Sequence, residues 1–228
     1  MELRGRLSAI AEKIPQCGTL ADIGTDHAYI PVFALLHSKC RRAVAADVKK
    51  GPVEIAVRNI RHYELENSIE TRLGYGLQPL LEGEADVIVI TGMGGMLITE
   101  ILTDGLEKAC KAGLLILQPM NAVEALREWL YETGFDIIEE TLAEETDKIY
   151  NILCVKWTGL IKKLDKFHYY IGYELEGRTD RLFKKYAAKR LKLLETMING
   201  MKMAEKGAEG LDGLIETRDR LEELIKKI

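Results

Sequence analysis

The chain has 228 residues, which is enough for one α/β domain of about 150 residues and a smaller second part. Its composition is 47% hydrophobic and 30% charged, and no apolar run reaches the roughly 20 residues that a membrane helix needs. The N-terminus lacks the long apolar core of a signal peptide, so we expect a cytoplasmic protein with no membrane partner.

Charge is unevenly distributed along the chain. The net charge of −4 by itself argues against a nucleic-acid partner. However, residues 159–228 hold 16 Lys and Arg against 12 Asp and Glu, whereas residues 1–158 hold 16 against 24. A basic C-terminal part is a weak indication of a polyanionic partner, because helical surfaces are normally charged.

Cysteines and histidines are scattered and show no metal-ligand spacing such as C-x-x-C. We therefore expect no metal and no disulfide, and we interpret the cysteines as small buried hydrophobic side chains in a reducing cytosol. The cysteines are Cys17, Cys40, Cys110 and Cys154, and the histidines are His27, His37, His62 and His168.

The first 158 residues alternate between strand-like and helix-like patterns. Apolar residues at helical spacing predict a first helix between Leu3 and Ile14, which Pro15 ends. Short apolar runs predict strands at 19–23, 43–47, 69–73, 86–91 and 113–118, and helices are expected at 28–39, 52–63, 96–108 and 122–132. Residues 135–142 and 148–157 predict an antiparallel pair, because only a short acidic turn separates them. This order predicts an α/β fold with an open parallel sheet and an antiparallel edge.

The pattern changes near Gly159, so we expect domains at 1–158 and 159–228. Strands vanish, and apolar residues at helical spacing mark one long helix. These residues are Leu175, Leu182, Tyr186, Leu191, Leu194 and Ile198. A glycine-interrupted segment at 200–213 and a second helical pattern at 214–225 complete a predicted helical hairpin resembling a coiled coil.

Acids and glycines follow the first four predicted strands. Asp22 and Gly24 follow the first and Asp47 the second, while 74–76 and 92–95 follow the third and fourth. The carboxyl ends of parallel strands are where open α/β sheets bind ligands. Asp47 lies 23 residues beyond Gly24, a separation that suits an acid binding ribose hydroxyls.

The first strand lacks the G-x-G-x-x-G loop that seats a pyrophosphate. Asp22 and Asp26 would also repel a diphosphate. A nucleoside with a neutral or positive tail fits better, and S-adenosylmethionine is such a ligand.

Each feature also has a purely structural interpretation. Asp47 could cap the next helix, 92–95 could be a plain strand-to-helix turn, and Asp22 with Asp26 could be a helix-capping pair. All of them falling on one edge of one sheet favours a binding site.

Three motifs resemble the bacterial tRNA (adenine-22-N1)-methyltransferase family. They are D-I-G-T-D-H-A-Y-I-P at 22–31, G-M-G-G at 92–95 and L-Q-P-M at 117–120. The resemblance covers nearly the whole chain. It implies a Rossmann-like class I methyltransferase sheet, a C-terminal helical domain, and methyl transfer from S-adenosylmethionine to N1 of an adenine in tRNA.

The resemblance also implies roles for individual cofactor-binding residues. Asp22 and Gly24 would line the methionine end of the cofactor and Asp47 its ribose. Gly92 and Met93 would form the wall near the reactive methyl group.

Two positions depart from the family's pattern. Tyr75 stands where the family usually has an acid that accepts a hydrogen bond from the cofactor's adenine, and Tyr75 could stack or hydrogen-bond instead. Met120 stands where the family often has asparagine, and Asn121 follows it directly.

For catalysis, Asp26 matches an acid that the family requires, and His27 stands beside it. Adenine N1 carries a free lone pair at neutral pH, so we expect direct in-line displacement in which positioning and charge stabilisation dominate. The target adenine must leave its stack, so a pocket near Met93, Gln118 and Pro119 is expected.

Basic residues cluster in the C-terminal part, which is the expected tRNA surface. They are Arg178, Arg181, Lys184, Lys185, Lys189, Arg190 and Lys192. The alternative interpretation is an ordinary solvated helix face.

Two rival functions stay open at this point. One is an S-adenosylmethionine enzyme acting on a small molecule or protein, with the hairpin as a dimerisation device. The other is a catalytically silent binding module. The basic hairpin favours a tRNA methyltransferase over the first rival, and Asp26 beside the cofactor strand argues against the second. The sequence does not determine the oligomeric state.

Overall fold

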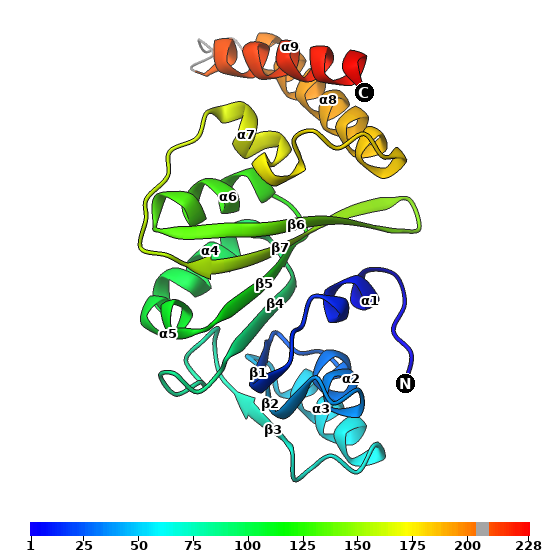
Figure 1. Ribbon diagram of the computed structural model, residues 1–228, viewed down its shortest axis with the longest axis vertical. Helices are drawn as coiled ribbons and strands as arrows, with labels where there is room; N and C mark the ends of the chain where they lie inside the picture. Colours follow the sequence, from blue (N-terminus) through cyan, green and yellow to red (C-terminus); the bar gives the residue numbers. More distant parts are fainter. Residues whose placement is uncertain (204–209) are drawn as a thin grey trace. The chain divides into compact units, whose positions relative to one another are not determined.

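The computed structural model describes residues 1–203 and 210–228, and the strands of this part form one seven-stranded sheet (Figure 1). Its order is β3-β2-β1-β4-β5-β7-β6. The strands are β1 Cys17–Ile23, β2 Cys40–Asp47, β3 Ile69–Leu73, β4 Val87–Met93, β5 Leu114–Pro119, β6 Phe135–Glu145 and β7 Lys148–Trp157. The first five are parallel, and β7 pairs antiparallel with both β5 and β6. The predicted Rossmann-like sheet with an antiparallel edge is confirmed.

Helices cover both faces of this sheet. Figure 1 shows α1, α2 and α3 on one face and α4, α5 and α6 on the other. Their bounds are α1 Gly5–Glu12, α2 Tyr29–Leu36, α3 Lys50–His62, α4 Gly95–Asp104, α5 Leu106–Lys111 and α6 Val123–Glu132. The prediction of a single helix at 96–108 is wrong in one respect, because the chain forms two helices, α4 and α5, separated by Gly105. A Cβ there would lie 2.7 Å from the Cβ of Leu77, so a close approach of another segment fixes the break.

Burial explains why the central strands carry continuous apolar runs. In β4, Val87 and Val89 belong to the core cluster that includes residues of α1, α2 and α3. Ile88 and Ile90 alternate with them and are also buried. Successive side chains of a strand point to opposite faces, so a sheet covered on both sides needs apolar residues at every position.

The strand order creates a switch point between β1 and β4. From β1 the chain winds outward to β2 and β3, then returns to place β4 on the other side of β1. Ile23 at the end of β1 pairs in register with Ile90 of β4. The loops that leave these two strands therefore diverge from adjacent points, which is where open α/β sheets form ligand crevices.

The chain divides into two compact units, Met1–Lys162 and Lys163–Ile228. The second contains α7 Lys166–Ile171, a 3₁₀ helix at Tyr173–Leu175, α8 Arg181–Met203 and α9 Leu211–Lys227. Helices α8 and α9 pack on each other, as expected for a helical hairpin. Part of the predicted glycine-interrupted segment, residues 204–209, lies outside the described residues.

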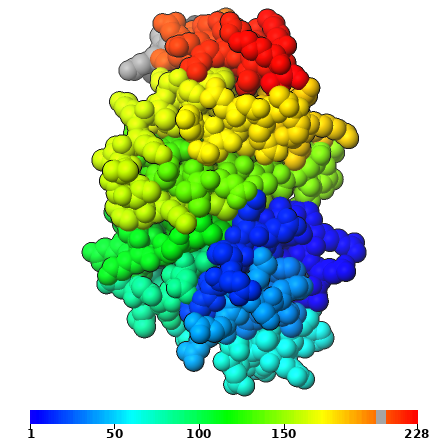
Figure 2. All heavy atoms as spheres, viewed as in Figure 1, coloured from blue at the N-terminus to red at the C-terminus, as the bar shows by residue number. Residues whose placement is uncertain are grey.

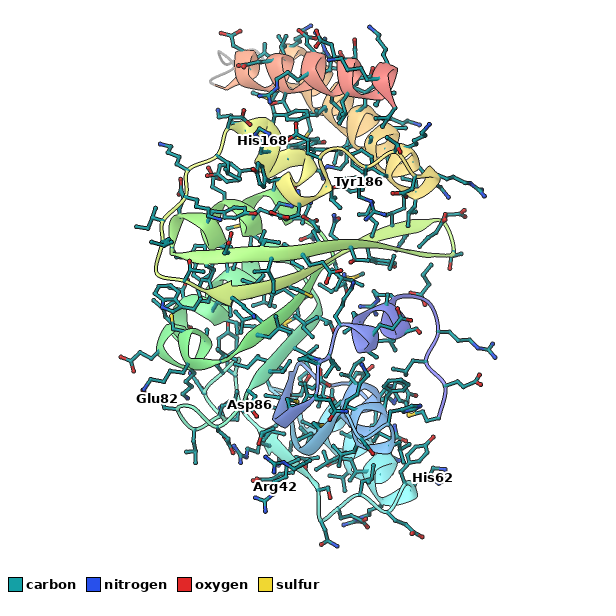
Figure 3. All side chains as sticks on the ribbon, in the orientation of Figure 1. Arg42, His62, Glu82, Asp86, His168 and Tyr186 are labelled. Atoms are coloured by element: carbon teal, nitrogen blue, oxygen red, sulfur yellow. The ribbon has the colours of Figure 1, made fainter. Side chains whose placement is uncertain are left out.

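The start of the long C-terminal helix differs from the prediction. Leu175, expected within it, lies in the 3₁₀ helix, and the short helix α7 was not expected. Asp165 caps α7 by accepting a hydrogen bond from the His168 backbone N–H at 2.9 Å, and it pairs with Arg220 of α9 at 2.7 Å. Figure 3 labels His168 on α7 and Tyr186 on α8. A six-residue helix held by such tertiary contacts leaves little periodicity in the sequence.

Within residues 1–203 and 210–228, no helix combines the length and apolar character needed to span a membrane. The same residues include no group of three or more His, Cys, Asp or Glu side chains placed to hold a metal ion. All four cysteines are free thiols.

Candidate functional site

The loop after β1 is a tight turn fixed by backbone contacts. Gly24 has φ of +77°, a conformation that favours glycine, and a Cβ there would overlap the methyl group of Met93. The N–H groups of Gly24 and Thr25 both donate to the carbonyl of Ala46, at 2.8 and 2.9 Å. Thr25 Oγ1 then accepts the N–H of Ala28, 3.1 Å away, just before α2 begins. This turn presents the side chains of residues 22–27 at the carboxyl edge of the sheet.

A pocket of about 320 Å³ lies at this edge. It gathers five of the predicted site residues, namely Asp22, Gly24, Asp26, His27 and Gly92. Arg6, Tyr29 and Thr91 also line it, although none was predicted as a site residue. The pocket thus joins the loop after β1, the end of β4 and the first turn of α1.

Asp22 is the buried carboxyl among the residues that line this pocket. It is 6% exposed, and burial raises its pKa from the usual 3.8 to about 6. A hydrogen bond from Thr25 opposes this rise, while the nearby Asp47 carboxylate adds to it. A carboxyl with this environment gains when a cationic group binds beside it, since the cation restores the stabilisation that water would provide.

Asp26 and His27 lie at the mouth of the pocket. The Asp26 side chain is 71% exposed, and its Oδ2 lies 3.3 Å from His27 Nε2. The His27 ring stacks on Tyr29, with centroids 4.9 Å apart and planes 4° from parallel. Asn59 of α3 donates to the His27 carbonyl at 2.8 Å, which ties the loop to the next helix. Asp26 is therefore a solvent-facing carboxylate on a fixed support.

Asp47 and Tyr75 lie farther along the same edge, beyond β1. Asp47 Oδ1 accepts the N–H of Lys49 at 2.7 Å, and its carbonyl accepts the N–H of Gly74 at 3.0 Å. Tyr75 donates its hydroxyl to Glu100 Oε1 of α4 at 2.5 Å, and this bond raises the pKa of the Tyr75 phenol to about 12. The tyrosine that replaces the family's acid thus has a carboxylate as its partner.

Gln118 and Pro119 end β5 and are buried. The Gln118 side chain is fully buried, and its amide is engaged on both sides. Its Oε1 accepts the N–H of Gly92 at 3.1 Å and a hydrogen bond from Arg6 Nη1. Its Nε2 donates to the carbonyl of Pro119 at 2.8 Å. Gln118 therefore stands behind the pocket wall that Gly92 and Arg6 form.

The basic residues predicted to bind tRNA all lie in the second unit. Arg181 and Lys184 are exposed on the first turn of α8, whereas Lys185 is half-buried. Arg178 precedes the helix and pairs with Asp180 at 2.7 Å. Lys192 is exposed, and it lies eleven residues beyond Arg181, which is about three helical turns and returns to nearly the same side of the helix. Arg181, Lys184 and Lys192 thus form a cationic stripe along α8.

A larger cavity lies at the opposite, amino-terminal edge of the sheet. It measures about 670 Å³ and is lined by residues such as Cys17, Arg41 and Asp86. Figure 3 labels Asp86, which precedes β4 and accepts the N–H groups of Gly18 and Thr19 at 2.9 and 2.8 Å. None of the predicted site residues lines this cavity, so its size alone does not make it the functional site.

Four residues around the site escaped prediction, and two of them did so for a common reason. Arg6 lies on α1 and Glu100 on α4, and neither has a motif around it. Thr91 belongs to β4 and was interpreted only as part of a strand. Tyr29 differs, because it falls inside the D-I-G-T-D-H-A-Y-I-P motif and could have been included. Tertiary contact alone brings Arg6 and Glu100 to the sheet edge.

Comparisons with known proteins agree with this geometry. Residues 3–153 match the family described as a methyltransferase domain. Over its whole length the chain is 34% identical to the tRNA (adenine(22)-N(1))-methyltransferase of Bacillus subtilis, of which it covers 97%. The crystal structure of the m1A22 tRNA methyltransferase of B. subtilis superposes with a TM-score of 0.84 at 34% identity, covering 99% of this chain and 98% of that one. A Streptococcus pneumoniae protein in complex with S-adenosyl-L-methionine superposes with a TM-score of 0.84 at 33% identity, covering 96% and 98%.

Proposed function

The chain belongs to the family of bacterial tRNA (adenine-22-N1)-methyltransferases, and we propose that it transfers a methyl group from S-adenosylmethionine to N1 of adenine 22 in tRNA. One observation carries the proposal. The pocket at the carboxyl ends of β1 and β4 combines a glycine turn with two carboxylates, in a chain similar to such an enzyme over its full length.

The pocket's charges and shape suit this cofactor. When bound, S-adenosylmethionine supplies an electrophilic methyl group on a positively charged sulfur. The buried Asp22 and the exposed Asp26 favour positive charge near them. Gly24 and Gly92 carry no side chain at this edge, and both have positive φ, at +77° and +75°. We infer that Asp22 and Gly24 contact the methionine end and that Gly92 and Met93 border the methyl group.

The nucleoside part would extend along the edge toward β2 and β3. Asp47 has one carboxylate oxygen beyond the one that accepts Lys49, and that oxygen can accept ribose hydroxyls. Val48, 55% exposed beside it, offers an apolar surface to a base. Tyr75 donates to Glu100, so its oxygen lone pair is left to accept a hydrogen bond from the adenine amino group.

Asp26 is the residue we assign to catalysis, with His27 beside it. Methylation at N1 makes the adenine ring cationic, and a carboxylate near the ring stabilises that charge or accepts a proton from the exocyclic amine. His27 holds Asp26 on one side through a contact of 3.3 Å. Gln118 and Pro119 are buried at the end of β5 and would support the pocket of the extruded base from behind.

We propose the first unit as the methyltransferase domain and the second as the tRNA-binding domain, in a reaction that takes place in the cytoplasm. Arg178, Arg181, Lys184 and Lys185 would contact tRNA phosphates, which a folded RNA presents by its shape. The stripe of Arg181, Lys184 and Lys192 on α8 supports this assignment.

The test is an assay with labelled S-adenosylmethionine and unmodified tRNA, followed by mapping of the labelled base. We expect the label on N1 of adenine 22, and we expect Asp26→Ala to lower turnover roughly 10²-fold or more while cofactor affinity stays unchanged. Glu132→Ala, an exposed acid at the end of α6, serves as the control and should retain full activity.

Three outcomes would contradict the proposal. Label on another base, or unchanged turnover of Asp26→Ala, would remove the assigned target or the assigned catalytic residue. Cofactor binding without methylation of any tRNA would favour an enzyme acting on a small molecule or protein, with the helical hairpin serving dimerisation.

A further inference from the structure

Arg6 is the only lysine or arginine among the residues that line the candidate pocket. The other charged side chains there are the carboxylates of Asp22 and Asp26, with His27 beside them. Arg6 lies in the first turn of α1, which contacts α2, β6 and β7. Figure 2 shows this N-terminal segment in dark blue on the surface, next to the lighter blue atoms of residues that follow β1. An acidic pocket thus has one guanidinium on its wall.

The Arg6 guanidinium is held from behind. Its Nη1 donates to Gln118 Oε1, and its Cζ lies 5.4 Å from the ring centre of Tyr150. The orientation of the Gln118 amide is fixed, because the N–H of Gly92 requires an acceptor and the carbonyl of Pro119 requires a donor. Gln118 therefore presents only an acceptor to Arg6, and it sets where the guanidinium lies above Gly92.

The guanidinium nevertheless lacks an anionic partner at hydrogen-bond distance. Arg6 Nε is buried and has no hydrogen-bond partner. The closest carboxylate, Glu145 Oε2, lies 3.9 Å from Nε, which is beyond the range of a hydrogen bond. The charge of the Arg6 side chain, which lines the pocket, is thus left without a hydrogen-bonded anion, and an anion that enters the pocket and reaches the guanidinium is bound favourably.

We propose that Arg6 binds the α-carboxylate of the cofactor's methionine end and that Gln118 is the residue that positions Arg6. This inference rests on the proposed function, since it assumes S-adenosylmethionine as the ligand. The methionine end is a zwitterion. Its ammonium and sulfonium groups suit Asp22 and Asp26, but the same two acids repel its carboxylate, and Arg6 supplies the opposite charge for a charge-assisted hydrogen bond.

The proposal is tested by calorimetry with three ligands that differ at the methionine end. S-adenosylhomocysteine carries the carboxylate, decarboxylated S-adenosylmethionine lacks it, and methylthioadenosine lacks the whole amino-acid end. We expect Arg6→Met to weaken S-adenosylhomocysteine binding roughly 10- to 100-fold and to leave the affinity for the other two ligands unchanged. Arg4 is exposed and immediately precedes α1, so Arg4→Met is the matched control. It should change the affinity for none of the three ligands.

The positioning role of Gln118 has its own readout. Gln118→Leu should weaken S-adenosylhomocysteine binding but not methylthioadenosine binding, and it should have no further effect in the Arg6→Met background. Because a buried polar residue is being replaced, folding of each variant is checked by its thermal unfolding. Arg6→Lys, which keeps the charge but loses the planar donors, should bind with intermediate affinity.

Three results would overturn the inference. Equal weakening of all three ligands would mean a general structural effect, and unchanged affinities would mean that Arg6 does not contact the cofactor. Weaker tRNA binding with unchanged cofactor affinity would assign Arg6 to an RNA phosphate. If the wild-type protein binds none of the three ligands, the proposed function itself fails, and this result is distinct from the other three.

Discussion

Asp22 shows how one residue's burial couples the fold to the chemistry of its pocket. Asp22 lies near the end of β1, is 6% exposed and lines a pocket proposed to hold a cationic ligand. The raised pKa of about 6 means that the folded protein without ligand carries an unfavourable negative charge at neutral pH. The buried charge lowers the free energy of unfolding of the ligand-free protein, and a cationic ligand bound beside it compensates this cost. Perturbed carboxylates of this kind are common at binding sites.

The pH dependence of stability follows from this pKa. Between about pH 4 and 6 the folded state binds more protons at Asp22 than the unfolded chain does, so its contribution to the free energy of unfolding falls as pH rises. We expect Asp22→Asn to be more stable than the wild type by roughly 2–3 kcal/mol at pH 8, with little difference near pH 4. Urea unfolding of the ligand-free proteins at both pH values measures this.

The control for this measurement is Asp104→Asn, an exposed acid at the end of α4. It should shift stability little at either pH. An Asp22→Asn variant that is less stable than the wild type at pH 8 would contradict this prediction. It would show that the contacts of the ionised carboxylate stabilise the fold by more than its desolvation costs.

At the scale of elements, a buried ionic network joins α6 to the antiparallel edge of the sheet. Arg127 of α6 is fully buried and binds both oxygens of Glu140 on β6, at 3.1 and 2.6 Å. Asn151 of β7 donates to the same carboxylate at 2.7 Å. The pairing of β6 with β7 shifts register between Ile137 and Glu139, just before Glu140. This bulge and the network together fix how the helix packs on the strands.

Breaking this network from one side should be costly. Arg127→Met leaves the buried Glu140 carboxylate without its guanidinium, and we expect a loss of about 3–5 kcal/mol in the free energy of unfolding. The double variant Arg127→Met with Glu140→Leu removes both charges and should lose clearly less. Denaturant unfolding measures the free energy of unfolding of both variants. A double variant less stable than Arg127→Met would contradict the prediction.

At the scale of the whole molecule, the candidate pocket and the cationic stripe belong to different units. The pocket lies in Met1–Lys162, whose sequence is acidic up to residue 158, and the stripe of Arg181, Lys184 and Lys192 lies on α8 of the other unit. A net negative protein can therefore still attract RNA locally, because charge interactions between exposed groups are screened beyond about 8–10 Å.

The proposed division of labour predicts a salt effect. Arg181→Glu with Lys184→Glu should weaken tRNA binding at least tenfold and lower the slope of log affinity against log salt by about 2, since two phosphate contacts are lost. Cofactor affinity should stay unchanged. Lys226→Glu with Lys227→Glu at the end of α9 makes the same change in net charge and is the control. Equal losses in both pairs would mean that only net charge matters.

The sequence by itself determined those features that depend on neighbours along the chain. Short apolar runs, which alternate with helical patterns along the chain, predicted the five parallel strands and the antiparallel edge. The motif at 22–31 predicted the turn with Asp22, Gly24 and Asp26. These predictions worked because strand burial and turn geometry are set by local residue types. The resemblance carried by the motifs then indicated the family.

Only the tertiary structure decided which distant segments meet. The strand order placed β4 beside β1, so that Gly92 and Asp22 share one pocket. The packing of helices on the sheet also brings Arg6 into a hydrogen bond with Gln118, 112 residues away. In the same way it brings Glu100 into a hydrogen bond with Tyr75. Tertiary contacts also decide three local features, which are the register shift in β6, the break at Gly105 and helix α7. Such contacts arise from the packing of whole elements, and side chains far apart in the sequence leave no local pattern that announces them.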